Sequence, residues 1–373
     1  MSIRKYILSI CLISLQSVFA QEYFIYVTAE SEDEVAVVKF DAEAQQAETV
    51  QRIPVGYMPT EIEGPHGITV SPDGKYWYLS MAHGMPYGKL YKFQTSDNKL
   101  VGETELGLFP ATMQVSEATG FLYIVNFNLH GKMLPSTVSV VDPESMTELS
   151  QITTGAMPHG SRISPDGMFH YSCAMMSGEL FEISTLDLEV NRTLKLDQDA
   201  GEDHSMHGMD GSMDHSMHKG HDMGGMKHSK VKPTWVIPHP TNGKVYVAGN
   251  GIAEVLEVDL EEWKISHRFP TGKGPYNVEI TPDGKKMVVT YKSDAQTGIW
   301  DLDTREELGR IDNSRKVSHG IALSPDSKYA FVSVEGIGAE PGSVDVIDLS
   351  ALKRVDVAEV GKQAGGITFW KMQ

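Results

Sequence analysis

The sequence predicts an all-β fold, a seven-bladed β-propeller of four-stranded blades, and two observations lead to this prediction. A unit of apolar strand, Pro-Asp-Gly-type turn and second apolar strand recurs along the chain. Its period of about forty to fifty residues is that of one propeller blade. For a chain of 373 residues with this strand pattern, a two-domain sandwich is the alternative fold.

The recurring unit is clear in four copies and weaker in two. The clear copies are "GPHGITVSPDGKYWYLS" from Gly64, "MPHGSRISPDGMFHYSC" from Met157, "GPYNVEITPDGKKMVVTYK" from Gly274 and "VSHGIALSPDSKYAFVSVE" from Val317. The weaker copies begin at Phe109 and Lys232. Turn residues between two runs of alternating apolar residues are typical of a β-hairpin.

The spacing of the turn prolines indicates one interruption of the repeat. Pro240, Pro282 and Pro325 follow one another at intervals of 42 and 43 residues, and Pro72 and Pro165 lie 93 residues apart, which is about two intervals. Between Pro165 and Pro240 the interval is 75 residues. About 30 residues are therefore inserted between two blades.

The number of second strands sets the number of blades. Seven are expected, at Ile25, Tyr76, Leu122, Phe169, Val245, Met287 and Tyr329. The first has no innermost strand before it, and the C-terminal "GGITFW" segment has no partners after it. We expect these two segments to complete one blade, which closes the ring without a free strand edge.

The first twenty residues are typical of a cleavable secretory signal peptide. Arg4 and Lys5 precede an apolar run that is too short to span a membrane, and a Val-Phe-Ala cleavage pattern ends at Ala20. We therefore expect a periplasmic or secreted protein without a membrane span. Residues 21–373 are expected to form a single propeller domain.

Charge and cysteine content narrow the classes of partner. The formal net charge of −18 disfavours nucleic acid and anionic membrane surfaces and favours cations. Cys173 is the sole cysteine outside the signal peptide, so an internal disulfide is excluded even in an oxidising compartment.

The insertion, at about 198–231, has an unusual composition. Its stretch "DHSMHGMDGSMDHSMHKGHDMGGMKH" (203–228) holds six of the 14 histidines and six of the 19 methionines but no Val, Ile, Leu or aromatic residue. Such a segment is expected to be flexible because it cannot bury a core. Thioether sulfur is a soft ligand for Cu(I), and imidazole binds both Cu(I) and Cu(II). We expect copper binding by His204, Met206, His207, Met209, Met213, His215, Met217, His218, His221, Met223, Met226 and His228.

A second set of candidate metal ligands is expected at one end of the central channel. His66, His159 and His319 occupy one repeat position, directly before the innermost strand. The same position in the other blades holds Ala111, Thr234, Tyr276 and Gly365. Residues that follow second strands reach the same end of the ring, and so does the insertion, which follows an outermost strand. The predicted fixed site comprises His66, His83, His130, His159 and His319, with Cys173 as a further ligand.

Two resemblances follow from these motifs. The segments "IYVTAESEDEVAVVKFD" and "PGSVDVIDL" resemble the repeat of seven-bladed YVTN-type propellers. The Met/His-rich stretch resembles periplasmic copper-resistance proteins and copper-resistance multicopper oxidases. The first resemblance implies the fold but leaves function open, because such propellers include lactonases, oxidoreductases and binding proteins.

These observations favour a periplasmic copper-binding propeller that sequesters, tolerates or delivers copper ions, with another periplasmic copper protein as a partner. One alternative is a copper oxidoreductase with a histidine site at the channel mouth, similar to the propeller of nitrous oxide reductase or to copper-dependent methanethiol oxidases. Another is a metal-free lactonase-like or interaction propeller. Glu63, Glu335 and Asp294 are expected near the same end, but their spacing singles out no acid–base pair.

Overall fold

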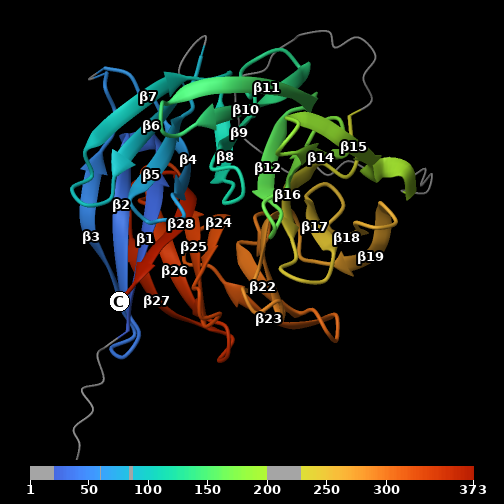
Figure 1. Ribbon diagram of the computed structural model, residues 1–373. Helices are drawn as coiled ribbons and strands as arrows, with labels where there is room; N and C mark the ends of the chain where they lie inside the picture. The colour runs from blue at the N-terminus through green and yellow to red at the C-terminus, as the bar shows by residue number, and fades with distance from the viewer. Residues whose placement is uncertain (1–20, 59, 84–86, 200–227) are drawn as a thin grey trace, which may run out of the picture.

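The fold predicted from the repeat is confirmed by a computed structural model, which describes residues 21–58, 60–83, 87–199 and 228–373. Within these ranges the chain forms 28 strands in seven antiparallel sheets of four, with two short 3-10 turns. The sheets follow one another around a ring in chain order (Figure 1). No helix in the described part of the chain is long and apolar enough to cross a membrane. A two-domain sandwich is therefore wrong.

Each sheet is one blade, and its strands follow one another in chain order from the channel outward, except that the C-terminal strand is the innermost strand of the first blade. The first blade is β28 (Ala364–Met372), β1 (Glu22–Ala29), β2 (Glu34–Asp41) and β3 (Gln46–Pro54). The second is β4 (Pro65–Val70), β5 (Tyr76–Met81), β6 (Lys89–Gln94) and β7 (Leu100–Glu105). The third is β8 (Pro110–Val115), β9 (Leu122–Asn126), β10 (Pro135–Asp142) and β11 (Thr147–Ala156).

The remaining four blades have the same order. The fourth is β12 (Pro158–Ile163), β13 (Phe169–Ala174), β14 (Glu179–Ser184) and β15 (Glu189–Lys195). The fifth is β16 (Pro233–Pro238), β17 (Lys244–Gly249), β18 (Glu254–Asp259) and β19 (Lys264–Pro270). The sixth is β20 (Pro275–Ile280), β21 (Lys286–Tyr291), β22 (Gln296–Asp301) and β23 (Glu306–Asp312). The seventh is β24 (Val317–Leu323), β25 (Tyr329–Glu335), β26 (Ser343–Asp348) and β27 (Lys353–Glu359). The 3-10 turns are Glu30–Glu32 and Leu196–Asp199.

The ring closes as expected, with the C-terminal strand beside the N-terminal one. β28 pairs antiparallel with β1, so that Ile25 lies opposite Phe369 and Tyr23 opposite Met372. β28 also contacts the innermost strands of both neighbouring blades, β4 and β24, and the Ser333 hydroxyl of the seventh blade donates to the Gly365 carbonyl at 2.6 Å. From β1, the Thr28 hydroxyl lies 3.3 Å from the His66 carbonyl oxygen. The innermost strand of this blade is therefore held on both sides.

Burial along the strands explains why apolar and polar residues alternate in some strands and not in others. The second strand β5 is buried along nearly its whole length because both of its faces are covered by neighbouring blades. The outermost strand β15 alternates between exposed and half-buried residues, since one of its faces meets water. The core thus consists of apolar layers between adjacent sheets, such as the cluster of Tyr171, Cys173, Val236 and Val247.

The recurring Ser-Pro-Asp-Gly sequence forms the turn between the first and second strands. In the second blade the Ser71 hydroxyl donates to the Asp73 carboxylate at 2.7 Å and accepts from the Tyr76 backbone at 3.0 Å. Gly74 has a φ of +69°, a conformation that glycine adopts at little cost. The aspartates of this motif are therefore turn residues, as the sequence suggested.

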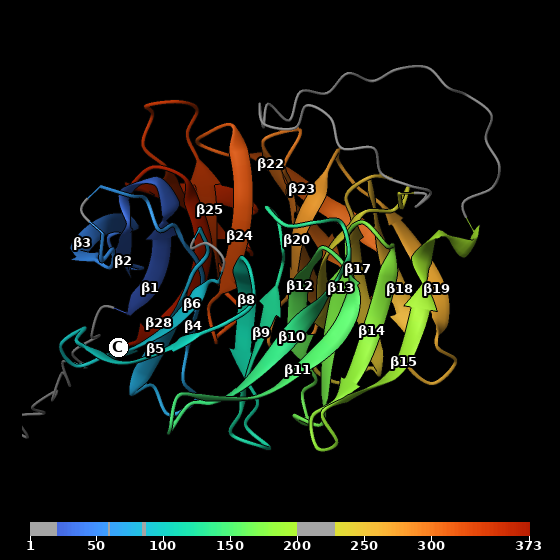
Figure 2. The same cartoon turned by 90° about the horizontal axis from the view of Figure 1, so that it is seen from above.

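The two ends of the ring differ in the loops they carry. Loops that join the second strand to the third, and one blade to the next, lie at the end where His66, His159 and His319 begin their strands. We call this end the histidine face. The Pro-Asp-Gly turns lie at the other end of the strands (Figure 2).

Candidate functional site at the channel mouth

One repeat position surrounds the channel mouth with four large and three small residues. Around the ring it holds His66, Ala111, His159, Thr234, Tyr276, His319 and Gly365. The His66 ring centre lies 6.0 Å from those of both His159 and His319, and Tyr276 lies 4.7 Å from His319. The small residues leave room for the four rings, because seven large side chains would not fit. The predicted meeting of the three histidines is confirmed.

The glycine that follows each of these histidines is required because a side chain would clash with the next blade. A Cβ atom on Gly67 would lie 1.7 Å from the Ala111 carbonyl oxygen of the next blade, and one on Gly160 would lie 2.4 Å from the Thr234 carbonyl oxygen. Innermost strands of neighbouring blades therefore approach closely just beneath the rings. In the His-Gly dipeptide of the repeat, the histidine places a side chain at the mouth and the glycine allows the neighbouring strands to approach closely.

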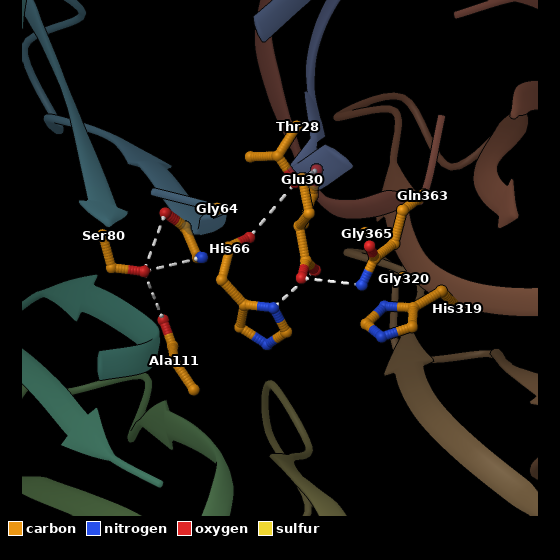
Figure 3. Close-up of polar contacts among 12 residues, drawn as sticks. Thr28, Glu30, Gly64, His66, Ser80, Ala111, His319, Gly320, Gln363 and Gly365 are labelled. Atoms are coloured by element: carbon orange, nitrogen blue, oxygen red, sulfur yellow. Dashed lines mark hydrogen bonds and ion pairs between the residues drawn. The ribbon is translucent and has the colours of Figure 1, made fainter. Parts of the chain in front are cut away.

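His66 forms the most directional polar contact of the mouth. Its Nδ1 atom lies 2.6 Å from Oε1 of Glu30, and both side chains are almost completely buried. Figure 3 shows Glu30 between the His66 ring and the Gln363 amide, which donates to Oε2 at 3.1 Å. Burial favours the neutral acid, but the nearby His66, His83 and His319 rings outweigh it and hold the pKa of Glu30 well below its usual range. Glu30 is therefore an anion that holds a proton on Nδ1 and leaves Nε2 of His66 as the basic nitrogen.

His159 is locked in a neutral form by its two hydrogen bonds. Nδ1 donates to the Thr234 carbonyl oxygen at 3.1 Å, and Nε2 accepts from the Tyr276 hydroxyl at 3.0 Å. Burial, with a smaller contribution from the nearby His66, lowers the pKa of His159 to about 3. Because both nitrogens are engaged, His159 supports the mouth and orients Tyr276 in this structure.

His319 is buried at the mouth and lies near two ionisable side chains, Glu335 and Lys292. Its Nε2 atom is 3.9 Å from Glu335, and Lys292 lies 3.7 Å from the same carboxylate and 4.3 Å from the centre of the Tyr276 ring. Burial lowers the pKa of His319 well below its usual value, and Lys292 acts in the same direction. His319 is thus a neutral ring that can donate or accept a hydrogen bond.

His83 and His130 border this group on the side of the second and third blades. Nε2 of His83 is 3.6 Å from Oε2 of Glu30, and its ring centre is 5.6 Å from that of His130. Phe109 packs against the rings of His66, His83 and His130 at 5.2–5.4 Å. All five predicted histidines therefore lie in one region, to which His130 is connected by its contact with His83.

Cys173 is not brought to the histidines. It is fully buried in the apolar layer between β13 and β17, and its Sγ atom lies 3.5 Å from the Gly160 carbonyl oxygen. Burial raises the pKa of the thiol to about 12. In the repeat Cys173 corresponds to Ser80 and Ser333, which bind the glycine of their own blade. We therefore leave Cys173 out of the site.

Most of the predicted copper-binding insertion lies outside the described residues. This concerns His204, Met206, His207, Met209, Met213, His215, Met217, His218, His221, Met223 and Met226, as well as the predicted signal peptide (1–20). His228 is described and exposed. The flanks of the insertion are attached at the histidine face, where Ser229 N donates to Met176 O at 3.0 Å and Val231 N donates to Asp197 at 3.1 Å.

A cavity of about 160 Å³ occupies the channel at the three histidines. His66, His159 and His319 line it together with Arg162 and Asn277. Oδ1 of Asn277 is buried and has no hydrogen-bond partner among the described residues. An unpaired buried acceptor calls for a donor such as water or a polar ligand, so this space is suited to a small polar group.

The described residues contain no cluster of three or more His, Cys, Asp or Glu side chains arranged to hold a metal ion. The arrangement instead provides two imidazoles that line a polar cavity, His66 and His319, with the Glu30 carboxylate bonded to His66 and the Lys292 ammonium near His319. Such a set suits general acid–base chemistry on a small molecule. The metal-ligand prediction for the five histidines stays a prediction.

Sequence reasoning missed Glu30, Lys292 and the role of Tyr276. A usable signal was present, because Glu30, Lys292 and Glu335 share a second repeat position, at the end of the second strand and beside the ring position. The equivalent residue in the third blade, Phe127, packs on His159 of the following blade at 4.8 Å. Glu30 contacts His66 of its following blade in the same way.

Comparison with known proteins supports the fold and suggests one function. The family profile "Lactonase, 7-bladed beta-propeller" matches residues 17–130, which is less than half of the chain. No curated protein sequence matches. Many solved structures share the fold.

Three of these structures illustrate how far the similarity reaches. Hydrazine synthase of Kuenenia stuttgartiensis has a TM-score of 0.60 at 20% identity, covering 79% of this chain and 81% of that one. A protein of unknown function from Desulfotomaculum acetoxidans has a TM-score of 0.67 at 14% identity, covering 93% and 98%. A Bacteroides fragilis protein described as a candidate 6-phosphogluconolactonase has a TM-score of 0.65 at 13% identity, covering 94% and 98%. At such identities they show the fold alone.

Proposed function

We propose that this chain is a lactonase-like hydrolase whose reaction centre is the channel mouth, with His66 as the general base. The buried contact between Nδ1 of His66 and Glu30 carries the proposal. A carboxylate on one ring nitrogen fixes the tautomer, makes the other nitrogen a better base and stabilises the imidazolium that forms when it takes a proton.

The chemistry requires one water molecule and no redox partner. Nε2 of His66 takes a proton from water as the water oxygen attacks the lactone carbonyl carbon. The tetrahedral intermediate then collapses, the ring C–O bond breaks, and the proton passes from His66 to the departing alkoxide. The products are a carboxylic acid and an alcohol on one molecule, and His66 returns to its starting state.

Two neighbouring groups are placed to stabilise the negative charge that develops on the carbonyl oxygen. His319 lines the same cavity as His66 and is a neutral ring that can donate a hydrogen bond. The Lys292 ammonium lies beside His319 and supplies positive charge at the mouth. Stabilisation of this kind is often the largest contribution to such a reaction.

The comparisons support the proposal without deciding it. The segment that matches the lactonase profile, residues 17–130, includes Glu30 and His66. The similarity to YVTN-type propellers is part of the same proposal, since lactonases are among the functions that such propellers perform.

A hydrolysis assay tests the proposal. Protein without residues 1–20 is assayed by pH-stat against unsubstituted, alkyl and sugar lactones in the presence of a chelator. We expect turnover that falls at least about 100-fold in His66→Gln, since that change removes the general base. Leu186→Ser, an exposed change at the opposite end of the ring, serves as the control. No turnover with any lactone, or equal turnover in His66→Gln, would refute the assignment.

Copper binding is a second candidate, favoured by the composition of residues 203–228. We propose that this insertion of the propeller domain binds Cu(I) and Cu(II) in a periplasmic or secreted protein, after removal of residues 1–20, for sequestration or delivery to another copper protein. The attachment of its flanks at the histidine face supports a role near the mouth. Its test is the last prediction of the Discussion.

A further inference from the structure

The most exposed large apolar side chains of this protein are gathered on one end of the ring. Six such residues in the described ranges are more than half exposed, and five of them lie on loops of the histidine face. These five, which we call the apolar rim, are Tyr57 (71% exposed), Ile62 (58%), Tyr87 (57%), Leu134 (53%) and Ile337 (63%). The sixth, Leu186 (64%), lies in the β14–β15 turn at the opposite end. Single exposed apolar residues are ordinary, but a gathering of this kind needs a reason.

Two of the rim loops follow second strands and also carry mouth residues. Ile337 lies two residues after Glu335, whose carboxylate is 3.9 Å from His319. Tyr87 lies four residues after His83, which is 3.6 Å from Glu30.

The other rim residues are also connected to the mouth residues, through contacts of His83. Leu134 follows His130, whose ring is 5.6 Å from that of His83. Tyr57 and Ile62 belong to the loop before β4, which is held to His83 by a backbone hydrogen bond of 3.0 Å from His83 N to Glu63 O. The rim therefore borders the polar mouth on the side of the seventh, first, second and third blades.

The charges at the mouth do not favour a phosphorylated substrate. Glu30 and Glu335 lie beside the histidine rings, and Lys292 is 3.7 Å from Glu335. Arg162, which lines the cavity, is paired with Glu279. Recognition of a phosphate group usually relies on arginine or on several unpaired cations. The net charge of −18 adds repulsion for any anion that approaches.

We infer that the substrate of the mouth is an uncharged lactone with an apolar alkyl tail, whose tail contacts the rim while its ring enters the mouth. This inference rests on the proposed hydrolase function and adds its substrate class. A polar mouth bordered by apolar side chains suits an amphiphilic molecule that enters with its polar group first. The rim then gains affinity by removing apolar surface from water on both partners.

The test measures kcat/KM for γ-lactones with alkyl tails of increasing length, alongside δ-gluconolactone and its 6-phosphate. Complete burial of one methylene is worth roughly four-fold in affinity, so a tail that lies on an open rim is expected to gain about two-fold per methylene. We expect Ile337→Ser, alone and combined with Ile62→Ser, to reduce this dependence on tail length. The equally exposed Leu186→Ser is expected to leave it unchanged.

The outcomes separate the inference from the function on which it rests. Hydrolysis that is independent of tail length, or that is fastest with the 6-phosphate, overturns the substrate class but keeps the hydrolase. A rim change that alters the oligomeric state in sedimentation, without affecting the tail-length dependence, makes the rim a self-association surface and also overturns the inference. Absence of hydrolysis with every lactone overturns the proposed function itself.

Discussion

His66 and Glu30 belong to neighbouring blades, and the 2.6 Å contact between Nδ1 and Oε1 joins them across the channel mouth. Glu30 begins the 3-10 turn after β1, whereas His66 lies near the start of β4. The pair therefore forms only when the first and second blades pack against each other. A carboxylate in this position orients an imidazole and stabilises its charged form.

Glu30→Gln is expected to lower kcat for lactone hydrolysis about 10- to 100-fold with little change in KM. The amide can still accept the proton of His66 Nδ1, but it has no charge to stabilise the imidazolium in the transition state. Gln363→Leu, which removes one neutral donor from the same carboxylate, is the matched control and is expected to cost only a few-fold. Equal kinetics for Glu30→Gln and the unaltered protein would assign Glu30 a purely structural role.

His170 makes the stability of the protein sensitive to acid. Both ring nitrogens lack hydrogen-bond partners in the described residues, and burial lowers the pKa of His170 to about 3. The unfolded chain binds a proton near pH 6.5 whereas the folded chain does not, so stability is full above pH 6.5 and falls as the pH drops toward 3. At pH 5 this costs about 2 kcal/mol relative to pH 8.

His170→Phe removes that proton site and keeps a ring that can stack on Tyr123, which lies 5.2 Å away. We expect the difference in unfolding free energy between pH 8 and pH 5, measured in denaturant, to shrink by about 2 kcal/mol. His267→Phe, at a half-buried outer-strand position, is the comparison and is expected to have a smaller effect. An unchanged pH dependence in His170→Phe would show that His170 is protonated in the folded protein.

The fold could be predicted from the sequence because the blade repeat fixes local structure many times over. Strand pattern, turn chemistry and spacing agreed in the four clear copies, and the closure of the ring followed from two incomplete ends. The mouth histidines could be predicted for the same reason, since a repeat position defines a place on the ring. What the pattern did not provide was the partner of each ring. Glu30 meets His66 through the packing of neighbouring blades, and this packing is visible only when equivalent positions of different blades are compared.

Cys173 illustrates the opposite limit. A lone thiol in a chain expected to be exported suggested a ligand. Its strand position, however, was that of Ser80 and Ser333, whose hydroxyls accept from the backbone of the glycine in the innermost strand. Alternation within one strand cannot distinguish a side chain that faces the channel from one that faces the next blade, because both are buried. The backbone irregularity between Pro158 and Ser161 also shifts the register at this point.

The thiol of Cys173 is expected to be inert in the native protein. It is fully buried, and burial raises its pKa to about 12, so the reactive thiolate is scarce. A thiol reagent at pH 8 should modify it only after unfolding, and Cys173→Ser should change stability by less than about 1 kcal/mol, since serine occupies the equivalent position in other blades. Rapid modification of the native protein would place the thiol at the surface, contrary to the structure.

A substitution of Gly67 tests how closely the innermost strands must approach each other beneath the histidines. Gly67→Ala would place Cβ 1.7 Å from the Ala111 carbonyl oxygen, so the two innermost strands would have to separate. We expect a loss of about 3 kcal/mol or more in unfolding free energy. Gly309→Ala is the control, because its Cβ meets only Leu352 at 3.8 Å. Equal stability of the two variants would mean that the blades tolerate greater separation at the mouth.

We expect the proposed copper binding by the insertion to be separable from the propeller. Ser229, Lys230 and Val231 form backbone contacts with Met176 and Asp197, so the deletion that spares the fold removes only residues 201–227. We expect the deleted protein to keep its thermal transition and its lactone hydrolysis, but to lose most of the Cu(I) measured after equilibrium dialysis. Copper that remains after the deletion, and is lost in His66→Gln, would place a fixed site at the channel mouth. If neither form retains copper, the insertion does not bind this metal, and its methionines require another explanation.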